Sequence, residues 1–241
     1  LHRDATLDFL NAGKHVLVEK PMARTEAECQ EMIAAWRKSG CVLMVAYPLR
    51  YHPILLRYKE LIDSREYGEV FNLSIWTEQY THFPDGSWAN RAETLGGGQF
   101  VSHGCHYVDI LLWFLGRPIR GIHLGTTKGT PWMEGEGTSN CVMEFENGVT
   151  AYHYGTWGSQ RPRSYYYFQA DCTNGVVQMR RWEGKLVALT RDAGEQVLLE
   201  GEIVLGRLPA RAGAGDRVED AVAAGDLDVD LRTRPDDVIG A

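Results

Sequence analysis

The sequence predicts an α/β plus α+β protein, in which the remnant of a parallel, doubly wound sheet precedes a domain with an open, mainly antiparallel sheet covered by helices. Residues 1–47 read as helix, strand, helix and strand, the order typical of a parallel sheet. Residues 118–200 contain short alternating strands separated by turn signals, which indicate antiparallel hairpins. Residues 100–115 predict a long apolar helix, which we expect to cover the antiparallel sheet.

The first helix and strand are bounded by a glycine and a proline. Apolar side chains recur with helical spacing from residue 1 to residue 12, and Gly13 is well placed to cap this helix at its C-terminus. The run HVLVEK, residues 15–20, predicts a short buried strand that ends at Pro21. No strand precedes the first helix, so the pattern starts in the middle of a doubly wound unit.

A second helix and strand follow the proline. Thr25 and Glu28 have the T-x-x-E spacing of a capping box, which predicts a helix that begins there and ends at Gly40. The continuous apolar run at 41–47 predicts a strand covered on both faces.

The pattern changes after residue 51. Residues 53–64 predict a helix, and residues 70–79 predict a strand with Phe71, Leu73 and Ile75 on one face. Three turn signals then divide residues 118–200 into an antiparallel meander. They are Asn147-Gly148, Asn174-Gly175 and Glu183-Gly184.

Composition and charge narrow the class of protein. The 241 residues carry a net charge of −7 and no strongly basic stripe, so we expect no nucleic-acid partner. No apolar run approaches the roughly 18–20 residues that span a bilayer, so we expect no membrane partner. The five cysteines are scattered without a C-x-x-C motif, which favours reduced thiols and a cytoplasmic location over a disulfide framework or a zinc site.

The first group of residues that could carry chemistry is Glu19-Lys20-Pro21. It lies at the carboxyl end of a predicted parallel strand, the edge of an α/β sheet where ligands bind. A lysine held near a cofactor could polarise a carbonyl or transfer a proton. The structural alternative is a solvated charge pair at the end of a strand. Arg50 follows the second strand, where it either faces the interdomain cleft or lies on the surface.

The second group follows three consecutive glycines, Gly96-Gly97-Gly98, which allow close backbone approach to a ligand or unusual dihedral angles. His106 and Asp109 share a helical face, and an imidazole oriented by a carboxylate is the usual form of a general base. The alternative is a helical histidine satisfied by a neighbour. His103, His106 and Asp109 could also be metal ligands, although the third would drift off the shared face, and we expect no metal.

Three motifs together resemble one family. They are AGKHVLVEKPMA at 12–23, AYPLRYHP at 46–53 and GGGQFVSHGCHYVDILLWFLG at 96–116. They are similar, in order and spacing, to the motifs of the glucose–fructose oxidoreductase / inositol dehydrogenase (Gfo/Idh/MocA) family. The resemblance covers roughly residues 1–200.

This resemblance implies a two-domain oxidoreductase that uses NAD or NADP and acts on a carbohydrate, inositol or related polyol. Residues 1–48 would be the C-terminal part of a Rossmann dinucleotide-binding domain, and residues 49–200 an α/β substrate and oligomerisation domain. The open sheet of such a domain implies a homo-oligomer. Residues 201–241 contain no aromatic residue, lysine or histidine, and we expect a divergent, poorly ordered tail.

The resemblance also implies roles for individual residues. Lys20 and His106 match the catalytic lysine and the histidine proposed as general acid/base. The remaining matches are to binding residues. Glu19, Lys20, Pro21 and Arg50 are expected to bind the cofactor, and Ser102, His103 and Asp109 the substrate.

The sequence departs from the family pattern in two places. Ser102 replaces an aspartate that is often paired with the histidine, so the tuning of His106 or the substrate is expected to differ. The G-x-G-x-x-G fingerprint and the strands around it, roughly 70 residues, are absent, and we expect this chain to bind dinucleotide weakly. The alternative function is a non-catalytic sugar-binding or oligomerisation module. A metal-dependent lyase or hydrolase is a third hypothesis.

Overall fold

A computed structural model describes residues 1–161 and 166–201, all within one compact unit, Leu1–Ile203. The predicted tail, 201–241, lies outside the described residues apart from Gly201. No helix in the described part of the chain is long and apolar enough to cross a membrane. The predicted boundary at residue 48 stays a prediction.

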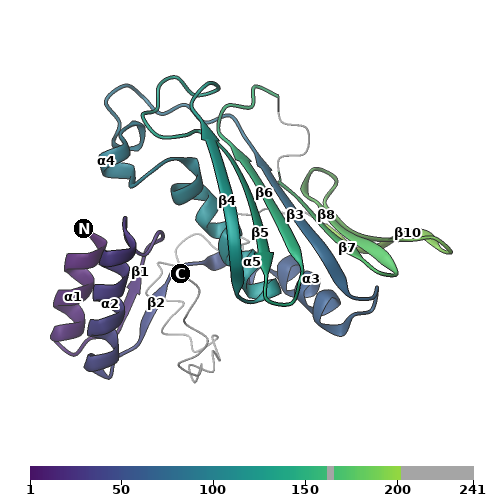
Figure 1. The fold of residues 1–241 in the computed structure, drawn as a ribbon, viewed down its shortest axis with the longest axis horizontal. Helices are drawn as coiled ribbons and strands as arrows, with labels where there is room; N and C mark the ends of the chain where they lie inside the picture. The colour runs from purple at the N-terminus through teal and green to yellow at the C-terminus, as the bar shows by residue number, and fades with distance from the viewer. Residues whose placement is uncertain (162–165, 202–241) are drawn as a thin grey trace, which may run out of the picture. The chain divides into compact units, whose positions relative to one another are not determined.

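A small parallel layer forms the first part of the fold and confirms the predicted order of elements (Figure 1). Strands β1 and β2 pair in parallel, with Leu17 opposite Met44. The bounds of its elements are α1 His2–Asn11, β1 Val16–Val18, α2 Glu26–Ser39 and β2 Leu43–Val45.

Local signals set the ends of α2. The Thr25 side chain accepts a hydrogen bond from the Glu28 amide, and Gly40 closes the helix with a φ of 67°. The Glu28 carboxylate accepts from the Arg24 amide at 3.0 Å rather than from Thr25 itself. The predicted capping box is therefore confirmed on its Thr25 side.

The core of this layer lies between the helices and one face of the strands. Leu10, Met32 and Val18 are buried there. On the other face Leu17 is 69% exposed and Met44 36% exposed. The prediction that the second strand is covered on both faces is therefore wrong for the described residues, because successive side chains alternate and α1 and α2 cover only one face.

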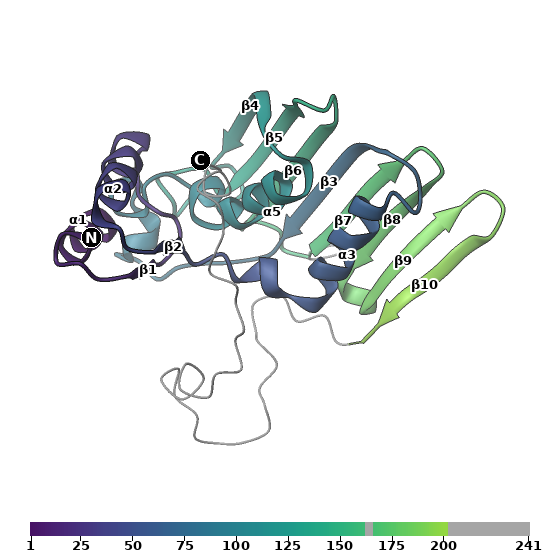
Figure 2. The same cartoon turned by 90° about the horizontal axis from the view of Figure 1, so that it is seen from below.

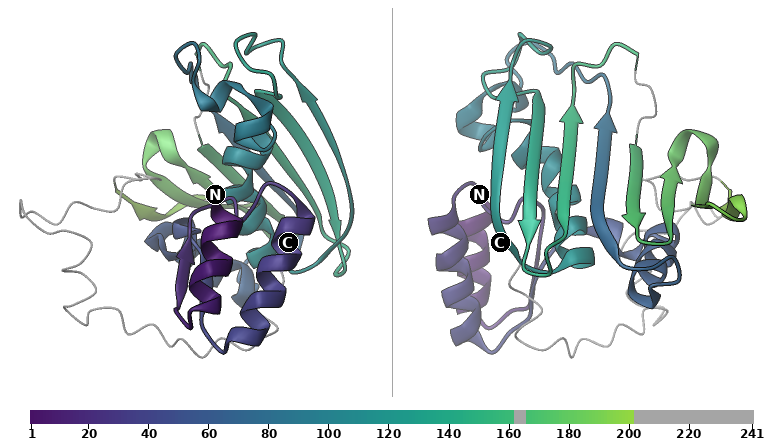
Figure 3. Two further views of the ribbon diagram at one scale, coloured as in Figure 1. Left: turned by 90° about the vertical axis from the view of Figure 1, so that its left-hand side faces the viewer. Right: turned by 45° about the vertical axis from the view of Figure 1, so that its right-hand side comes forward.

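The second part of the fold is an eight-stranded mixed sheet, with strand order β10-β9-β8-β7-β3-β6-β5-β4. Figure 3 shows β3 lying between β6 and β7. The bounds are β3 Val70–Glu78, β4 Pro118–Thr126, β5 Thr138–Phe145, β6 Thr150–Thr156, β7 Tyr166–Cys172, β8 Gly175–Arg180, β9 Lys185–Thr190 and β10 Gly194–Glu200.

The predicted hairpins are confirmed, but the predicted meander is not continuous. The three turns join β5 to β6, β7 to β8 and β8 to β9. Strand β3, from earlier in the chain, separates β6 from β7 and pairs with β6 in parallel. Phe71, predicted on the same face as Leu73 and Ile75, is 55% exposed while those two are buried, because the β3–β7 pairing shifts register between Val70 and Asn72.

Two helices cover one face of this sheet, as Figure 2 shows: α3, Pro53–Ser64, and α5, Cys105–Leu115. The Tyr58 hydroxyl of α3 donates to the carbonyl of Val177 at 2.9 Å. Tyr107 of α5 stacks on His153 of β6 at 5.5 Å between ring centroids, and both Tyr58 and Tyr107 meet the edge of Phe168. The predicted cover is thus confirmed, with α3 as a second covering helix.

Shorter elements lie between these helices and strands. They are the 3-10 turns η1 Pro48–Tyr51, η2 Trp88–Asn90 and η4 Arg181–Glu183, the helix α4 Ala92–Leu95 and the π-helical turn η3 Phe100–Gly104.

Candidate active site

Lys20 joins the small layer to the turn that precedes the helix of His106. It follows β1 by two residues, at the carboxyl end of the strand, and is half-buried. Its Nζ donates to the backbone carbonyl of Ser102 at 2.8 Å, across 82 residues of sequence. The carboxyl edge of the parallel layer is the expected ligand edge of such a sheet, and here it meets η3 directly.

The three glycines shape the approach to this point. Gly96 ends α4 with a φ of 84°, and Gly97 has a φ of 154°. A side chain on Gly98 would collide with the backbone and carboxylate of Glu136. The close approach predicted for this segment is therefore to Glu136, whose carbonyl accepts from the Gln99 amide at 2.7 Å.

The turn η3 then leads into α5. Its Phe100 amide donates to Glu136 Oε1 at 3.1 Å, so one residue of the 127–137 loop holds the start of η3. A π-helical turn inserts a wider turn into a helix, and such turns are frequent at functional sites. This turn carries Ser102, whose carbonyl accepts from Lys20, and it ends two residues before His106.

His106 is half-buried, and its Nδ1 is buried without a hydrogen-bond partner. The ring meets the edge of Tyr47, with 5.9 Å between centroids. Burial, and then the positive charge of Lys20, lower the pKa of His106 from 6.5 to about 4. The imidazole is consequently neutral near pH 7 and able to accept a proton.

His103 lies beside it in a more enclosed position. Its Nδ1 is 3.3 Å from Nε2 of the buried Gln99. Its ring also lies near the rings of Tyr107 and Trp157, with 5.2 and 6.2 Å between ring centroids. Burial is the largest of the effects that lower the pKa of His103 to about 3, with His106 next. This histidine is therefore built into the packing behind the site.

Arg50 and Asp109 bind each other. Arg50 Nε and Nη2 donate to the two oxygens of Asp109 at 2.8 and 2.6 Å, a bidentate pair. Asp109 is buried, and burial raises its pKa while Arg50 opposes the rise. Among the described contacts Asp109 makes no hydrogen bond to His106, because both of its oxygens bond to Arg50 and Nδ1 of His106 has no partner.

The remaining predicted residues lie at the margin of the site. Glu19 is exposed and accepts from the Lys20 amide at 3.2 Å. The carbonyl of Pro21 lies 2.8 Å from Nδ1 of His2. Ser102 contributes its backbone carbonyl to Lys20. The roles of all these residues in binding cofactor or substrate stay predictions.

Two residues near the site were missed in the sequence. Tyr47 was hidden in an apolar run, although its place two residues after β2 puts it at the same sheet edge as Lys20. Gln99 follows the glycines directly, but nothing local shows that it contacts Gly155 of β6. No group of three or more histidine, cysteine or acidic side chains that could hold a metal occurs among residues 1–161 and 166–201.

Comparison with known proteins identifies two matching domains. The GFO/IDH/MocA C-terminal domain matches residues 55–178, and the oxidoreductase family with an NAD-binding Rossmann fold matches residues 1–47. The chain is 38% identical over 148 residues to 1-carboxy-3-chloro-3,4-dihydroxycyclo hexa-1,5-diene dehydrogenase of Comamonas testosteroni, covering 59% of this chain and 36% of that protein. It is 31% identical over 179 residues to D-xylose 1-dehydrogenase (NADP(+)) 2 of Haloferax volcanii, covering 74% and 53%.

Solved structures show the same fold. An NAD-binding oxidoreductase from Klebsiella pneumoniae aligns with a TM-score of 0.73 at 24% identity, over 83% of this chain and 58% of that one. An oxidoreductase from Agrobacterium radiobacter aligns with a TM-score of 0.74 at 17% identity, over 85% and 59%. The chain spans about a third to a half of the curated relatives it matches. With both domains matched in order, and the C-terminal domain over half of its length, the chain belongs to the Gfo/Idh/MocA family of oxidoreductases.

Proposed function

We propose that this chain takes part in hydride transfer between NAD or NADP and a carbon that bears a hydroxyl group in a sugar, inositol or related polyol. The observation that carries the proposal is the hydrogen bond from Lys20 to the Ser102 carbonyl. It places a cation of the parallel layer beside the turn that leads to the neutral base His106.

Each side chain has a distinct task in this reaction. When bound, the nicotinamide supplies the hydride acceptor or donor. The Lys20 ammonium binds and polarises the substrate oxygen, which stabilises negative charge as it develops there. His106 removes the hydroxyl proton during oxidation and returns it during reduction. Its low pKa, about 4, keeps the imidazole unprotonated and ready to accept that proton near pH 7.

The residues present fit the reacting end of such a cofactor. Nδ1 of His106 is a buried polar atom with no protein partner, and Lys20 lies at the carboxyl edge of β1 and β2. A substrate oxygen would give the imidazole a partner there. The pyrophosphate end would need a glycine-rich turn that leads into a helix N-terminus, and residues 1–47 contain no G-x-G-x-x-G.

The substrate class is supported by the relatives. Those similar to this chain include the D-xylose 1-dehydrogenase of Haloferax volcanii and a scyllo-inositol 2-dehydrogenase (NADP(+)) of Bacillus subtilis, which is 29% identical over 57% of this chain. Both names specify an alcohol carbon on a polyhydroxylated ring or chain. We carry that class, and no single sugar, to this protein.

The test is a screen for reduced nicotinamide. The reading frame is first sequenced through both ends, and its whole product is incubated with NAD or NADP and a panel of aldoses, inositols and cyclic diols. If the proposed function is right, at least one polyol of the panel should yield reduced nicotinamide. A sugar that binds, as measured by calorimetry, without nicotinamide reduction in either direction would support the non-catalytic binding module instead.

We also propose that the face of the large sheet opposite α3 and α5 mediates homo-oligomerisation. Near β4 and β5 this face exposes Ile122, Leu124 and Val142, which are 59%, 65% and 45% exposed. Contiguous apolar side chains on an uncovered face favour contact with another protein surface.

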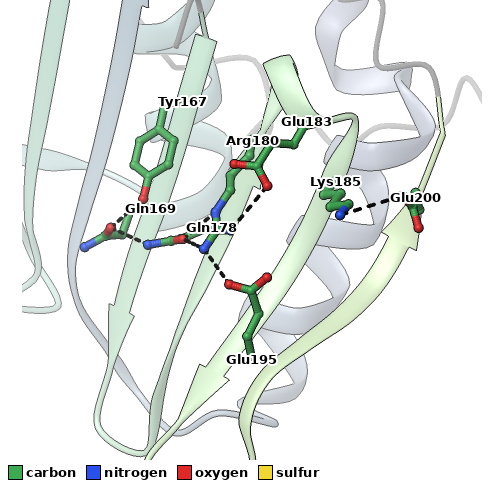
Figure 4. Close-up of polar contacts among 8 residues, drawn as sticks. All are labelled: Tyr167, Gln169, Gln178, Arg180, Glu183, Lys185, Glu195 and Glu200. Carbon is green, nitrogen blue, oxygen red and sulfur yellow. Dashed lines mark hydrogen bonds and ion pairs between the residues drawn. The ribbon is translucent and has the colours of Figure 1, made fainter. Parts of the chain in front are cut away.

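The other part of this face is polar and internally ordered, as Figure 4 shows. Gln178 donates to Gln169 at 2.9 Å, and Arg180 donates to Gln178 at 2.6 Å and to Glu195 at 3.0 Å. The side chains are therefore held in place before any contact forms. A Leu124→Lys variant is expected to shift the protein to monomer in analytical ultracentrifugation, and an unchanged mass would contradict the proposal.

A further inference from the structure

The segment that follows β2 touches α5 at two places. Tyr47 meets the ring of His106, and Arg50, three residues later, binds Asp109, three residues beyond His106. The Arg50 guanidinium also lies 5.9 Å from the ring centroid of Trp113. Asp109 and Trp113 are four residues apart and share one helical face, so Arg50 contacts two successive turns of α5.

His106 lies between two fixed points, one on η3 before its helix and one on α5 itself. On the N-terminal side, Lys20 holds the Ser102 carbonyl, four residues before it. On the C-terminal side, Arg50 holds Asp109 with two hydrogen bonds. A bidentate guanidinium–carboxylate pair fixes orientation as well as distance, and α5 can neither rotate nor slide at this turn without breaking it.

We propose that the Arg50–Asp109 pair is a positioning device for His106, which holds the imidazole against Tyr47 and beside Lys20. The inference rests on the proposed function of His106 as the base. It assigns both residues to the scaffold of the site, where the family resemblance implied contacts to cofactor and substrate.

The pair acts on His106 through geometry and not through charge. The pKa of His106 is set by burial and by Lys20, and Asp109 contributes neither a hydrogen bond nor a shift. Two opposite results are thus distinguishable. Removing a carboxylate that acted through its charge would lower the pKa of His106 further. Removing a carboxylate that holds the ring in a buried place would expose the ring and raise the pKa toward 6.5.

The experiment is a histidine NMR titration of the 241-residue chain with isotope-labelled histidine, in which a His106→Gln variant assigns the signal. Asp109→Asn is the test variant. We expect its His106 pKa to rise by about one unit or more above the value of about 4 in the parent. The matched control is Glu69→Gln, which removes an exposed pair with Arg65 and should leave the titration unchanged.

A second variant tests the proposal if Asp109→Asn fails to fold. Arg50→Met with Asp109→Leu removes both charges together, a change that buried pairs often tolerate. It alters no net charge, so a rise in the pKa of His106 in this folded variant also reports lost positioning. An unchanged or lowered pKa in either folded variant would overturn the proposal.

Activity separates this inference from the proposed function. In the whole active protein, Asp109→Asn is expected to lower kcat, to move the acidic limb of the pH–kcat profile upward and to leave KM for the polyol nearly unchanged. A rise in KM with an unaltered His106 titration would show that Asp109 binds substrate directly, against this inference. Absence of turnover in the parent would refute the proposed function, while the titration would still decide the positioning role.

Discussion

The small parallel layer and the large sheet supply opposite halves of the candidate site. The layer delivers Lys20 from the end of a three-residue strand, half-buried, with its charge satisfied by one carbonyl. The large sheet delivers His106 from a helix packed on its inner face, where burial keeps the ring neutral. Both side chains are half-buried, and they differ in their contacts: Lys20 has a backbone carbonyl as its partner, whereas Nδ1 of His106 is buried without a hydrogen-bond partner.

The largest effect is expected at His106, on the side of the large sheet. His106→Asn keeps a polar side chain but removes the base, and it should lower kcat of the whole product by about 10²–10⁴-fold, the usual contribution of a general base. Steady-state reduction of nicotinamide measures this. Lys128→Met, at an exposed lysine outside the candidate site, is the control for a substitution that does not touch the site. An undiminished kcat in His106→Asn would show that His106 is not the base of the reaction.

The packing of that half is tested at Phe168. Its ring is fully buried and meets both Tyr58 of α3 and Tyr107 of α5, so Phe168→Ala leaves a cavity where both helices join the sheet. We expect a loss of about 3–5 kcal/mol of unfolding free energy, measured by urea denaturation. Met32→Ala in the small layer provides the comparison, with an expected loss of about 2–5 kcal/mol. Equal stability of Phe168→Ala and the parent would contradict this account of the core.

Acid should weaken the large sheet through His153. Burial lowers the pKa of His153 from 6.5 to about 3. Between these two pH values the histidine is protonated in the unfolded chain and neutral in the folded chain. The stability contribution is complete above pH 6.5 and is lost as the pH falls toward 3. The loss amounts to about 2 kcal/mol at about pH 5. Urea denaturation above pH 6.5 and at about pH 5 measures this loss. A His153→Gln variant should show a correspondingly smaller loss, and an equal loss in both proteins would assign the acid sensitivity elsewhere.

The smallest effect is expected in the small layer, at the N-terminus of α2. Thr25→Ala removes the side chain that accepts from the Glu28 amide and should cost about 1 kcal/mol. Thr25→Asn, which retains a capping oxygen, should restore most of that stability. Thermal unfolding compares the three proteins. A loss in Thr25→Asn as large as that in Thr25→Ala would show that the cap is not the cause.

The two regions also differ in how far their sequence predicts their structure. In the small layer the signals are local: Thr25 and Gly40 mark the ends of α2, and Pro21 follows the end of β1 closely. The hairpin turns of the large sheet are local too, and they are confirmed. The parallel pairing of β3 with β6 is not a local feature. It joins strands more than 70 residues apart, and the alternation within each strand does not specify which strand it pairs with.

In the candidate site, too, local features could be predicted from the sequence and long-range contacts could not. Lys20 and His106 could be identified from motifs and their residue chemistry. The partner of Asp109 could not, because Arg50 lies 59 residues away and only the packed fold shows that it, and not His106, takes both oxygens. The π-helical turn at Phe100–Gly104 begins where the Phe100 amide bonds to Glu136, a residue outside the predicted helix 100–115.

The most direct test of the account is the protonation of His106 with and without Lys20. A histidine NMR titration of the 241-residue chain should give a pKa of about 4 for His106 in the parent and a higher value in Lys20→Met, because burial and the Lys20 charge both lower it. This result would show that the two regions meet in one site. A pKa near 6.5 that is the same in both proteins would contradict it, because His106 would then be neither enclosed nor beside Lys20.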